Sequence, residues 1–425
     1  MPAEEKKKNI IVYVMSIPGG AAESIHEWGK REKTNYRVML LWDAKVKFDP
    51  DKAKDADLVV SCNFSKPSSI AKALLPYQEE LLAITCRSEP NIERFAQVLP
   101  HVPYLHSPTV ESLRWASDKY LMRQRFKMYN PKITPEFTLV MKNTKEERER
   151  IVSKIGFPLI IKPANLSGSL LVSVCYHEEE LEKTLSTAFR KIRKAYKNDN
   201  RLEEPRLVAE GFMEGDMYSI DSYVNSRGKV VHCPLVKVVT GKKVGHDSFQ
   251  GYLQITPPLF KKTTVAKAEE VAEAAIHALG LRSSIAHTEL MKIDDEWKVV
   301  EIGARMGGFR HLLYKLTCDI DHSLNDVLVR IPKAPVIPKK CHSYACAMKW
   351  FAHKEGTIKE MRGVKKIEAL ESFYSIAINK KIGDRAVFAQ NGGRSVFNLI
   401  MRNSDRSKLL ADIRRVEQMV KIVVG

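Results

Sequence analysis

The sequence predicts an α/β and α+β chain in three parts. These are an N-terminal doubly wound parallel-sheet domain (1–115), a two-lobed α+β core (116–333) and a basic, mostly β C-terminal segment (334–425) that closes the core. Two observations lead to this division. Short apolar runs alternate with helical patterns until the texture changes near Ser117, and a proline-rich connector over 331–338 precedes the last segment. The chain of 425 residues is long enough for two or three domains with buried cores.

The N-terminal part alternates strand and helix patterns. Buried strands are predicted at 9–15, 36–42, 56–61 and 81–85, with a helix over 68–75 among the intervening segments. This alternation favours a doubly wound parallel sheet. The Pro18-Gly19-Gly20 segment after the first strand lacks the GxGxxG pattern. We therefore interpret it first as a turn and only second as a ligand-binding loop.

The core begins with Asp118, which is expected to cap a helix over 119–128. A small lid lobe is expected over about 136–215. Further elements of the core are expected as strands at 157–163 and 170–175, a helix at 178–197, two strand patterns within 206–221 and a helix at 265–279. A helix over 407–419 closes the C-terminal segment.

Two glutamates in the second half of the core are the most informative residues. Glu289 and Glu301 each lie in a short apolar run, and a polar turn at 294–296 separates the runs, which predicts an antiparallel hairpin. One carboxylate on each strand, facing the same side, would hold Mg²⁺, which takes one or two carboxylates and completes its shell with phosphate and water. Arg305 adds a permanent cation suited to a phosphate or an oxyanion. Ordinary solvent-facing strand glutamates would give the same local pattern.

Lys162 ends an apolar strand just before the small-residue loop that contains Ser167, Gly168 and Ser169. Such a loop offers free backbone N–H groups, and a neighbouring lysine adds a compact positive charge for phosphate. A surface lysine beside a flexible hairpin is the alternative. The loop lacks GK[ST], so a P-loop is not supported.

The order of these features resembles the ATP-grasp superfamily, in which ATP lies between two α+β lobes. The resemblance covers about 115–330, and the flanking parts look like those of its carboxylate–amine ligases. The L-amino acid ligases are the most similar in pattern, because His287-Thr288-Glu289 is followed by Glu301 and then by Ala304-Arg305.

The resemblance implies a role for each of these residues. Lys119 and Lys162 would contact the ATP phosphates, and the loop of Ser167, Gly168 and Ser169 would be the flap over them. The segment from Glu210 would read the adenine edge through its backbone, with Phe212 and Met213 as apolar walls. Glu289 and Glu301 would bridge Mg²⁺ to the phosphates, and Arg305 and Lys162 would be the catalytic pair, with Arg305 steadying the acyl phosphate.

Two positions depart from the superfamily pattern. Gly303 stands where an asparagine usually ligates metal, which leaves one or two Mg²⁺ ions open and suggests that Gly303→Asn is tolerated or tightens metal binding. Met217 stands where an acidic residue often holds the ribose. Asp216 beside it is the candidate instead, although strand alternation would point it to the other face unless the strand bulges.

The implied activity is ATP-dependent ligation through an acyl phosphate, with release of ADP and phosphate. The implied cofactors are ATP and Mg²⁺, with Mn²⁺ as a substitute, and the substrates are a small carboxylate and an amine such as amino acids or a short peptide. A homodimer is left open. The alternatives are an ATP-grasp enzyme with another nucleophile, of the carboxylase or purine-pathway type, and a nucleic-acid-binding protein with an inactive core.

Three histidine and aspartate positions have weaker signals. His287 could orient a carboxylate or deprotonate the amine, but a packed strand histidine explains it more simply. His246 and Asp247 lie in a polar stretch and are candidates for the acceptor pocket.

Composition limits the partners and the location. The net charge is +18, but the basic residues are not interleaved with stacking aromatics. We therefore interpret them as a solvated basic surface or as a source of attraction for anionic substrates, not as a nucleic-acid site. Seven cysteines without a CxxC pair are interpreted as reduced core residues, without disulfides or zinc, in a cytoplasmic protein. Without an apolar run of about 18 residues, no membrane association is expected.

Overall fold

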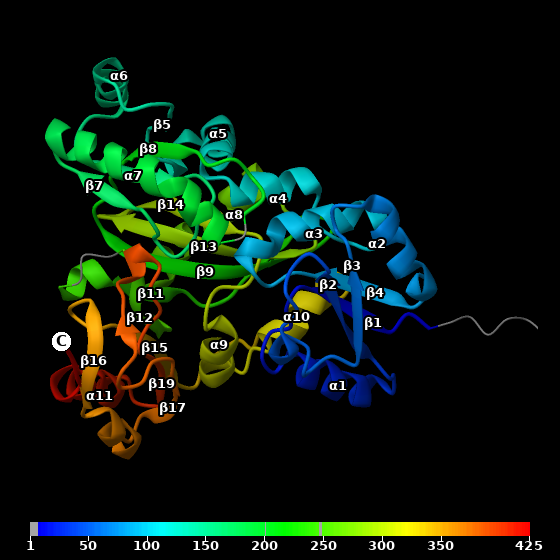
Figure 1. The fold of residues 1–425 in the computed structure, drawn as a ribbon. Coiled ribbons are helices and arrows are strands. Elements are labelled where there is room, and N and C mark those ends of the chain that lie inside the picture. Colours follow the sequence, from blue (N-terminus) through cyan, green and yellow to red (C-terminus); the bar gives the residue numbers. More distant parts are fainter. Residues whose placement is uncertain (1–6, 200, 246–248) are drawn as a thin grey trace, which may run out of the picture.

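The computed structural model describes residues 7–199, 201–245 and 249–425. They form four sheets, and Figure 1 shows how these are arranged: the N-terminal sheet lies to one side, the lid lobe lies over a long central sheet, and the C-terminal segment continues below it. The mixed α/β and α+β fold class predicted from the sequence is confirmed.

The N-terminal sheet has the strand order β3-β2-β1-β4, and all three neighbouring pairs are parallel. Its elements are β1 (Ile10–Val14), α1 (Ala21–Glu32), β2 (Arg37–Asp43), β3 (Leu58–Cys62), α2 (Pro67–Leu74), β4 (Leu81–Thr85) and α3 (Ile92–Val98). Every residue of β1 is buried, as expected for a strand covered by helices on both faces. The predicted doubly wound parallel sheet is confirmed.

A helix from far along the chain packs on this domain. Helix α10 (His322–Leu328) lies beside α1, and the Thr85 hydroxyl at the end of β4 donates to the Asp326 carboxylate at 2.5 Å. One hydrophobic cluster runs from β1 and β2 through α10 to Trp297 and Val299 in the core. The N-terminal domain is therefore packed tightly against the core.

Helices α4 (Val110–Ser117) and α5 (Lys119–Tyr129) connect this domain to the lid lobe. The Asp118 side chain accepts from the Leu121 backbone N–H at 3.0 Å, so Asp118 caps α5 as predicted.

The lid lobe is a four-stranded antiparallel sheet of order β5-β8-β6-β7 under two helices. Its elements are β5 (Phe137–Val140), α6 (Lys145–Ile155), β6 (Leu159–Pro163), β7 (Ser173–Cys175), α7 (Glu178–Asn198) and β8 (Leu207–Gly211). The buried residues Leu181, Leu185, Ala188 and Ile192 form one apolar stripe on α7 and pack into a core of the lobe's own.

The central sheet has the path β14-β13-β9-β11-β12-β15-β19-β17, with β10 paired to β9 beside it. Its elements are β9 (Asp216–Val224), β10 (Val230–His232), β11 (Val236–Thr240), β12 (Gly251–Thr256), β13 (Ser284–Ile293), β14 (Glu296–Gly303), β15 (Tyr344–Trp350), β17 (Phe373–Ile378) and β19 (Phe397–Asn403). Helix α8 (Lys262–Ala278) packs on β13 and β14, and α9 (Arg310–Cys318) packs on β12 and β15. The two strand patterns predicted within 206–221 thus belong to different sheets.

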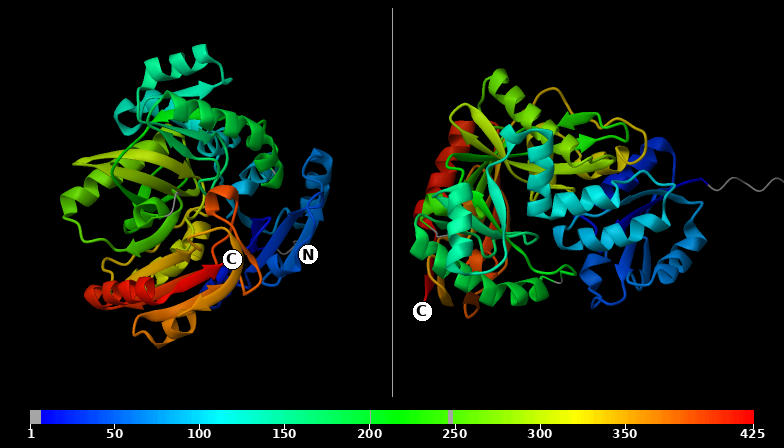
Figure 2. Two further views of the ribbon diagram at one scale, coloured as in Figure 1. Left: turned by 60° about the vertical axis from the view of Figure 1, so that its left-hand side comes forward. Right: turned by 90° about the horizontal axis from the view of Figure 1, so that it is seen from above.

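The C-terminal segment extends the core instead of standing apart from it. Strand β15 pairs directly with β12, so the central sheet runs on into the last part of the chain (Figure 1). The left view of Figure 2 shows this segment, in orange and red, against the rest of the core. The remaining elements are β16 (Gly356–Arg362), β18 (Arg385–Ala386), α11 (Arg406–Met419) and β20 (Lys421–Val424). The domain limits at 115, 215 and 333 stay predictions.

The prediction that no cysteine forms a disulfide is wrong. Cys318, the last residue of α9, is bonded to Cys341, with their Cα atoms 4.0 Å apart. The proline-rich connector brings Cys341 back to α9 after 23 residues, a separation that no local motif marks. The five free cysteines among the described residues are buried, as expected. Within the same residues, no helix is both long and apolar enough to cross a membrane.

Candidate active site

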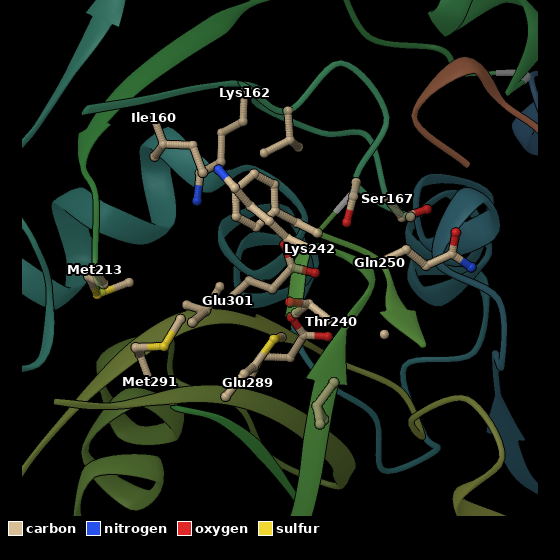
Figure 3. Close-up of a pocket in the computed structure, with 18 of the residues that line it drawn as sticks. Ile160, Lys162, Ser167, Met213, Thr240, Lys242, Gln250, Glu289, Met291 and Glu301 are labelled. Carbon is tan, nitrogen blue, oxygen red and sulfur yellow. The ribbon is translucent and has the colours of Figure 1, made fainter. Parts of the chain in front are cut away.

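A cavity of about 590 Å³ lies between the lid lobe and the central sheet. In Figure 3, Lys162 and Ser167 from the lid side face Glu289 and Glu301, which lie on the two long strands below. The structure brings all but one of the predicted site residues to this cavity. These are Lys119, Lys162, Ser167, Gly168, Ser169, Glu210, Phe212, Met213, Glu289, Glu301 and Arg305.

Lys162 is held by a buried ion-pair network. Its Nζ lies 2.8 Å from Glu210 Oε2, and Arg123 grips both oxygens of the same carboxylate at 3.0 and 2.8 Å. Burial lowers the pKa of Lys162 to about 8, although Glu210 partly opposes this. Arg123 also donates to the Val299 and Val300 carbonyl oxygens of β14, each at 2.7 Å, and so ties α5 to the central sheet.

Glu210 therefore has a structural role, as the ion-pair partner of Lys162, in addition to the predicted role of its segment at the adenine edge. Its side chain is buried and positions Lys162, while the chain that follows it lines the cavity. Sequence reasoning missed Arg123, because α5, β8 and β14 are separate in the chain and nothing local marks their meeting.

Lys119, the first residue of α5, contacts both the lid lobe and the central sheet. Its Nζ lies 3.1 Å from Glu301 Oε2 and donates to the Leu166 carbonyl oxygen at 2.8 Å. Burial alone would raise the pKa of Glu301, but the cations of Lys119 and Lys162 lower it to about 2. Glu301 is consequently an ionised carboxylate near neutral pH.

The two glutamates are cross-strand partners. Glu289 pairs with Glu301 in the antiparallel register of β13 and β14, and a bulge follows between Glu289 and Leu290. Directly opposed residues share a face of the sheet, so both side chains line the cavity, and the predicted hairpin is confirmed. Two carboxylates on one wall fit Mg²⁺, which takes its other ligands from phosphate and water. Among the described residues no group of three or more His, Cys, Asp or Glu could hold a metal on its own.

Arg305 is paired with a residue of the N-terminal domain. Its Nε lies 2.6 Å from Glu89 Oε2, and its Nη1 donates to the Met306 carbonyl oxygen at 2.9 Å. A Cβ added at Gly303 would lie 2.9 Å from the same Glu89 oxygen. A side chain at position 303 would therefore have to displace the end of the flexible Glu89 side chain, and the tolerance of Gly303→Asn stays a prediction.

His287 belongs to a buried hydrogen-bond network next to Glu289 and Glu301. Its Nδ1 lies 2.6 Å from Asp221 Oδ1, while Asp221 Oδ2 contacts His322 Nε2 and the Gly307 backbone N–H, each at 2.8 Å. Burial would lower the pKa of His287, but Asp221 raises it overall. The other ring nitrogen lies 3.6 Å from Glu289 Oε1, so His287 both packs in the strand and faces a site carboxylate.

The loop of Ser167, Gly168 and Ser169 lies at the cavity with an unusual backbone. Gly168 has a φ of 71° and Ser169 a φ of 59°, the left-handed region that favours glycine. Before the loop, the Tyr196 hydroxyl donates to the Asn165 side chain at 2.7 Å and anchors its start.

Phe212 and Met213 form part of an apolar end of the cavity, together with Ile160 and Met291. The sequence analysis missed Lys242, whose Nζ lies 5.7 Å from the Tyr176 ring centroid and 5.1 Å from that of Phe249. It belongs to a short 3-10 turn after β11, which has no sequence motif.

Asp216 is the predicted site residue that does not line the cavity. Met217 lines it instead, because the β9 pairing continues from 217 to 219 without a bulge and Asp216 points to the other face. The Asp216 carboxylate is paired with Lys243 and lies 3.7 Å from Lys237. His246 and Asp247 lie outside the described residues.

Comparisons with known proteins agree with this geometry. The ATP-grasp domain family matches residues 155–311. Alanine–anticapsin ligase of Bacillus subtilis (strain 168) is 24% identical over 380 residues, which are 80% of this chain and 77% of that protein. A D-alanine–D-alanine ligase of Leptospira interrogans is 23% identical over 228 residues, 51% of this chain and 60% of that protein, so the chain spans less than two thirds of it.

Solved structures show the same fold. The crystal structure of the L-amino acid ligase from Bacillus licheniformis superposes with a TM-score of 0.76 at 16% identity, covering 99% of this chain and 100% of that one. N5-carboxyaminoimidazole ribonucleotide synthetase from Thermotoga maritima superposes with a TM-score of 0.67 at 17% identity, covering 98% and 100%. Residues 155–311 of this chain therefore match an ATP-grasp domain, and the relatives that the chain resembles are ligases.

Proposed function

We propose that this chain is an ATP-dependent carboxylate–amine ligase that forms an amide or peptide bond between amino acids or short peptides. The observation that carries the proposal is the wall of Glu289 and Glu301 facing Lys119 and Lys162, with Arg305 beside them. The relatives named as alanine–anticapsin and D-alanine–D-alanine ligases support the class of reaction.

The reaction proceeds in two steps. A substrate carboxylate oxygen attacks the γ-phosphorus of ATP, the bond to ADP breaks, and an acyl phosphate forms. The amine then attacks the acyl carbon, loses a proton, and phosphate leaves. Phosphoryl transfer needs positioning and charge neutralisation more than covalent chemistry from the protein.

Each part of the site has a proposed role in these steps. Lys119 and Lys162 hold the phosphates, with Glu210 and Arg123 fixing the position of Lys162. Arg305 offers a guanidinium to the acyl phosphate and the developing oxyanion.

The binding of ATP and metal uses the remaining residues. Ser167, Gly168 and Ser169 close over the phosphates, and the chain from Glu210 to Met213 holds the adenine. Glu289 and Glu301 would hold Mg²⁺, for which Mn²⁺ is proposed as a substitute, and the ion when bound would offset phosphate charge. Asp216 is not retained for the ribose, because its carboxylate is turned away from the cavity.

A release assay tests the proposal. ADP and phosphate are measured with MgATP and amino acids supplied singly and in pairs, and products are identified by mass spectrometry. ADP released together with a condensed product supports the ligase. Release with bicarbonate, but with no amino acid, would identify another nucleophile and overturn the proposal. Tight nucleic-acid binding without ATP turnover would do the same. A homodimer and a cytoplasmic location stay predictions.

A further inference from the structure

Two cations that line the cavity on the side of Glu289 are not used by the proposed steps. Lys349 comes from β15 in the C-terminal segment, and Arg310 comes from the start of α9. Among the described residues, Lys349 is the one member of the segment 334–425 that lines the cavity. The strand that joins this segment to the central sheet thus contributes a charge to the site.

Among the residues that the structure describes, the surroundings of Lys349 offer an aromatic ring but no ion pair. No ion pair within 4.0 Å joins its Nζ to an acid in the described part of the chain, and its contact is with the Phe309 ring, whose centroid lies at 5.6 Å. Burial and then the charge of Arg310 lower the pKa of Lys349, although the Glu289 carboxylate partly opposes this. Burial and the neighbouring Arg310 thus disfavour the charged form of Lys349.

Arg310 is rigid and incompletely bonded. Its Nη1 donates to Gln254 Oε1 and its Nη2 to Ser219 Oγ, each at 2.6 Å, so the guanidinium is fixed under the cavity wall. The side chain is 2% exposed, and its Nε lies within ion-pair distance of Asp221, at 3.8 Å, but has no hydrogen-bond partner among the described residues. A buried donor left unpaired is costly and is normally satisfied by a ligand or water.

Three other cations of the site are each paired with a carboxylate, whereas Lys242 contacts two aromatic rings. Lys119 faces Glu301, Lys162 faces Glu210, and Arg305 faces Glu89. Lys349, beside Arg310, thus adds a positive charge that no carboxylate within 4.0 Å balances among the described residues. Low-dielectric walls around such a pair favour a bound anion.

We propose that Lys349, supported by Arg310, binds an oxyanion carried by the acceptor amine, either a carboxylate or a phosphate. The inference rests on the proposed ligase function and deepens it, because it requires the acceptor to be an anionic amine such as an amino acid and not a neutral amine. Lys349 is then a specificity-determining residue, and Arg310 fixes the other side of the same subsite.

The experiment varies the acceptor charge and the lysine together. Three acceptors of similar size are compared by ADP release and product formation: an amino acid, its α-amide, and a phosphorylated amine. Each is tested with the wild-type chain, with Lys349→Met, and with Lys354→Met as the matched control, since Lys354 is exposed and does not line the cavity. Lys349→Arg tests rescue by a retained charge.

The wild type is expected to prefer one anionic acceptor over the amide by about 10- to 100-fold in kcat/KM, the range of a charge-assisted contact. Lys349→Met should remove most of that preference by raising the acceptor KM, Lys349→Arg should restore part of it, and Lys354→Met should behave as wild type. The favoured acceptor, carboxylate or phosphate, identifies the oxyanion.

Two results would overturn the subsite while leaving the ligase intact. One is equal use of the amide and both anionic acceptors by the wild type. The other is a Lys349→Met change that raises the KM for ATP, or that affects all acceptors alike, as expected if Lys349 only offsets Glu289.

If no acceptor is turned over, the ligase proposal itself fails. The subsite is then judged by calorimetric titration with inorganic phosphate in the presence of MgADP. Binding that is lost in Lys349→Met but kept in Lys354→Met supports it, and equal binding overturns it.

Discussion

The two charged ends of the cavity are built differently. At the proposed phosphate end, Lys162 is buried against Glu210, whose carboxylate also pairs with Arg123, so both cations have a carboxylate partner within the protein. At the far end, Lys349 is half-buried and faces no carboxylate within ion-pair distance among the described residues. The first arrangement orients a lysine before ATP arrives, and the second leaves positive charge for a substrate to neutralise.

The largest expected effect comes from removing the support of the phosphate end. Arg123→Met would leave the buried Glu210 with one cation and would take the donors from two β14 carbonyls, so unfolding free energy should fall by about 3–5 kcal/mol. Urea unfolding measures this. Arg114→Met, at an exposed position on the neighbouring helix, is the control. Unchanged stability of Arg123→Met would show that the network is not structural.

Glu289 and Glu301, the proposed metal ligands, lie between the two ends. Loss of either carboxylate should stop turnover without unfolding the chain. Glu301→Gln is expected to lower kcat for ADP release by about 100- to 1000-fold, because a fixed charge at the transferring phosphate is removed. Glu296→Gln, exposed on the same strand, is the control, and thermal unfolding checks the fold. Wild-type turnover by Glu301→Gln would refute the site.

Removal of the phosphate lysine should act on ATP binding first. Lys162→Ala is expected to weaken MgATP binding by about 1.5–3 kcal/mol in calorimetry, since a charge-assisted contact is lost while Arg123 still neutralises Glu210. Lys142→Ala, exposed in the same lobe, should bind as wild type. Equal affinity in Lys162→Ala would place the phosphates elsewhere.

The lowered pKa of Lys162 predicts a pH dependence of ATP binding. The lysine loses its proton as the pH rises through about 8, and phosphate binds the charged form, so affinity should be level below pH 8 and fall above it. A fall of up to about tenfold between pH 8 and 9 is expected by calorimetry. Lys162→Arg, which stays charged, should give a flatter profile. A flat profile in the wild type would contradict the assignment.

The smallest effect is expected at the contact between the N-terminal domain and Arg305. Gly303→Asn should displace Glu89 and lower turnover by a few-fold, about 1 kcal/mol, with little change in stability because Glu89 is a flexible side chain. Glu89→Gln should act in the same direction on steady-state ADP release. Higher turnover or tighter Mg²⁺ binding in Gly303→Asn would instead support metal ligation by the introduced asparagine.

The sequence by itself determined the features that depend on short stretches of chain. The alternation of strands and helices predicted the N-terminal sheet, and Asp118 marked the start of α5. The polar turn between two apolar runs predicted a hairpin with Glu289 and Glu301 on its two strands. Periodicity, capping and hairpin turns are local, so these elements can be predicted without knowing the neighbours.

Only the tertiary structure decided which distant residues meet. Arg123 reaches Glu210 and β14, Glu89 reaches Arg305 from another domain, and Lys349 enters the cavity because β15 pairs with β12. The Cys318–Cys341 disulfide has the same origin. A salt bridge or disulfide between separate elements depends on how sheets and helices pack in three dimensions, and single-chain patterns have no signal for that packing.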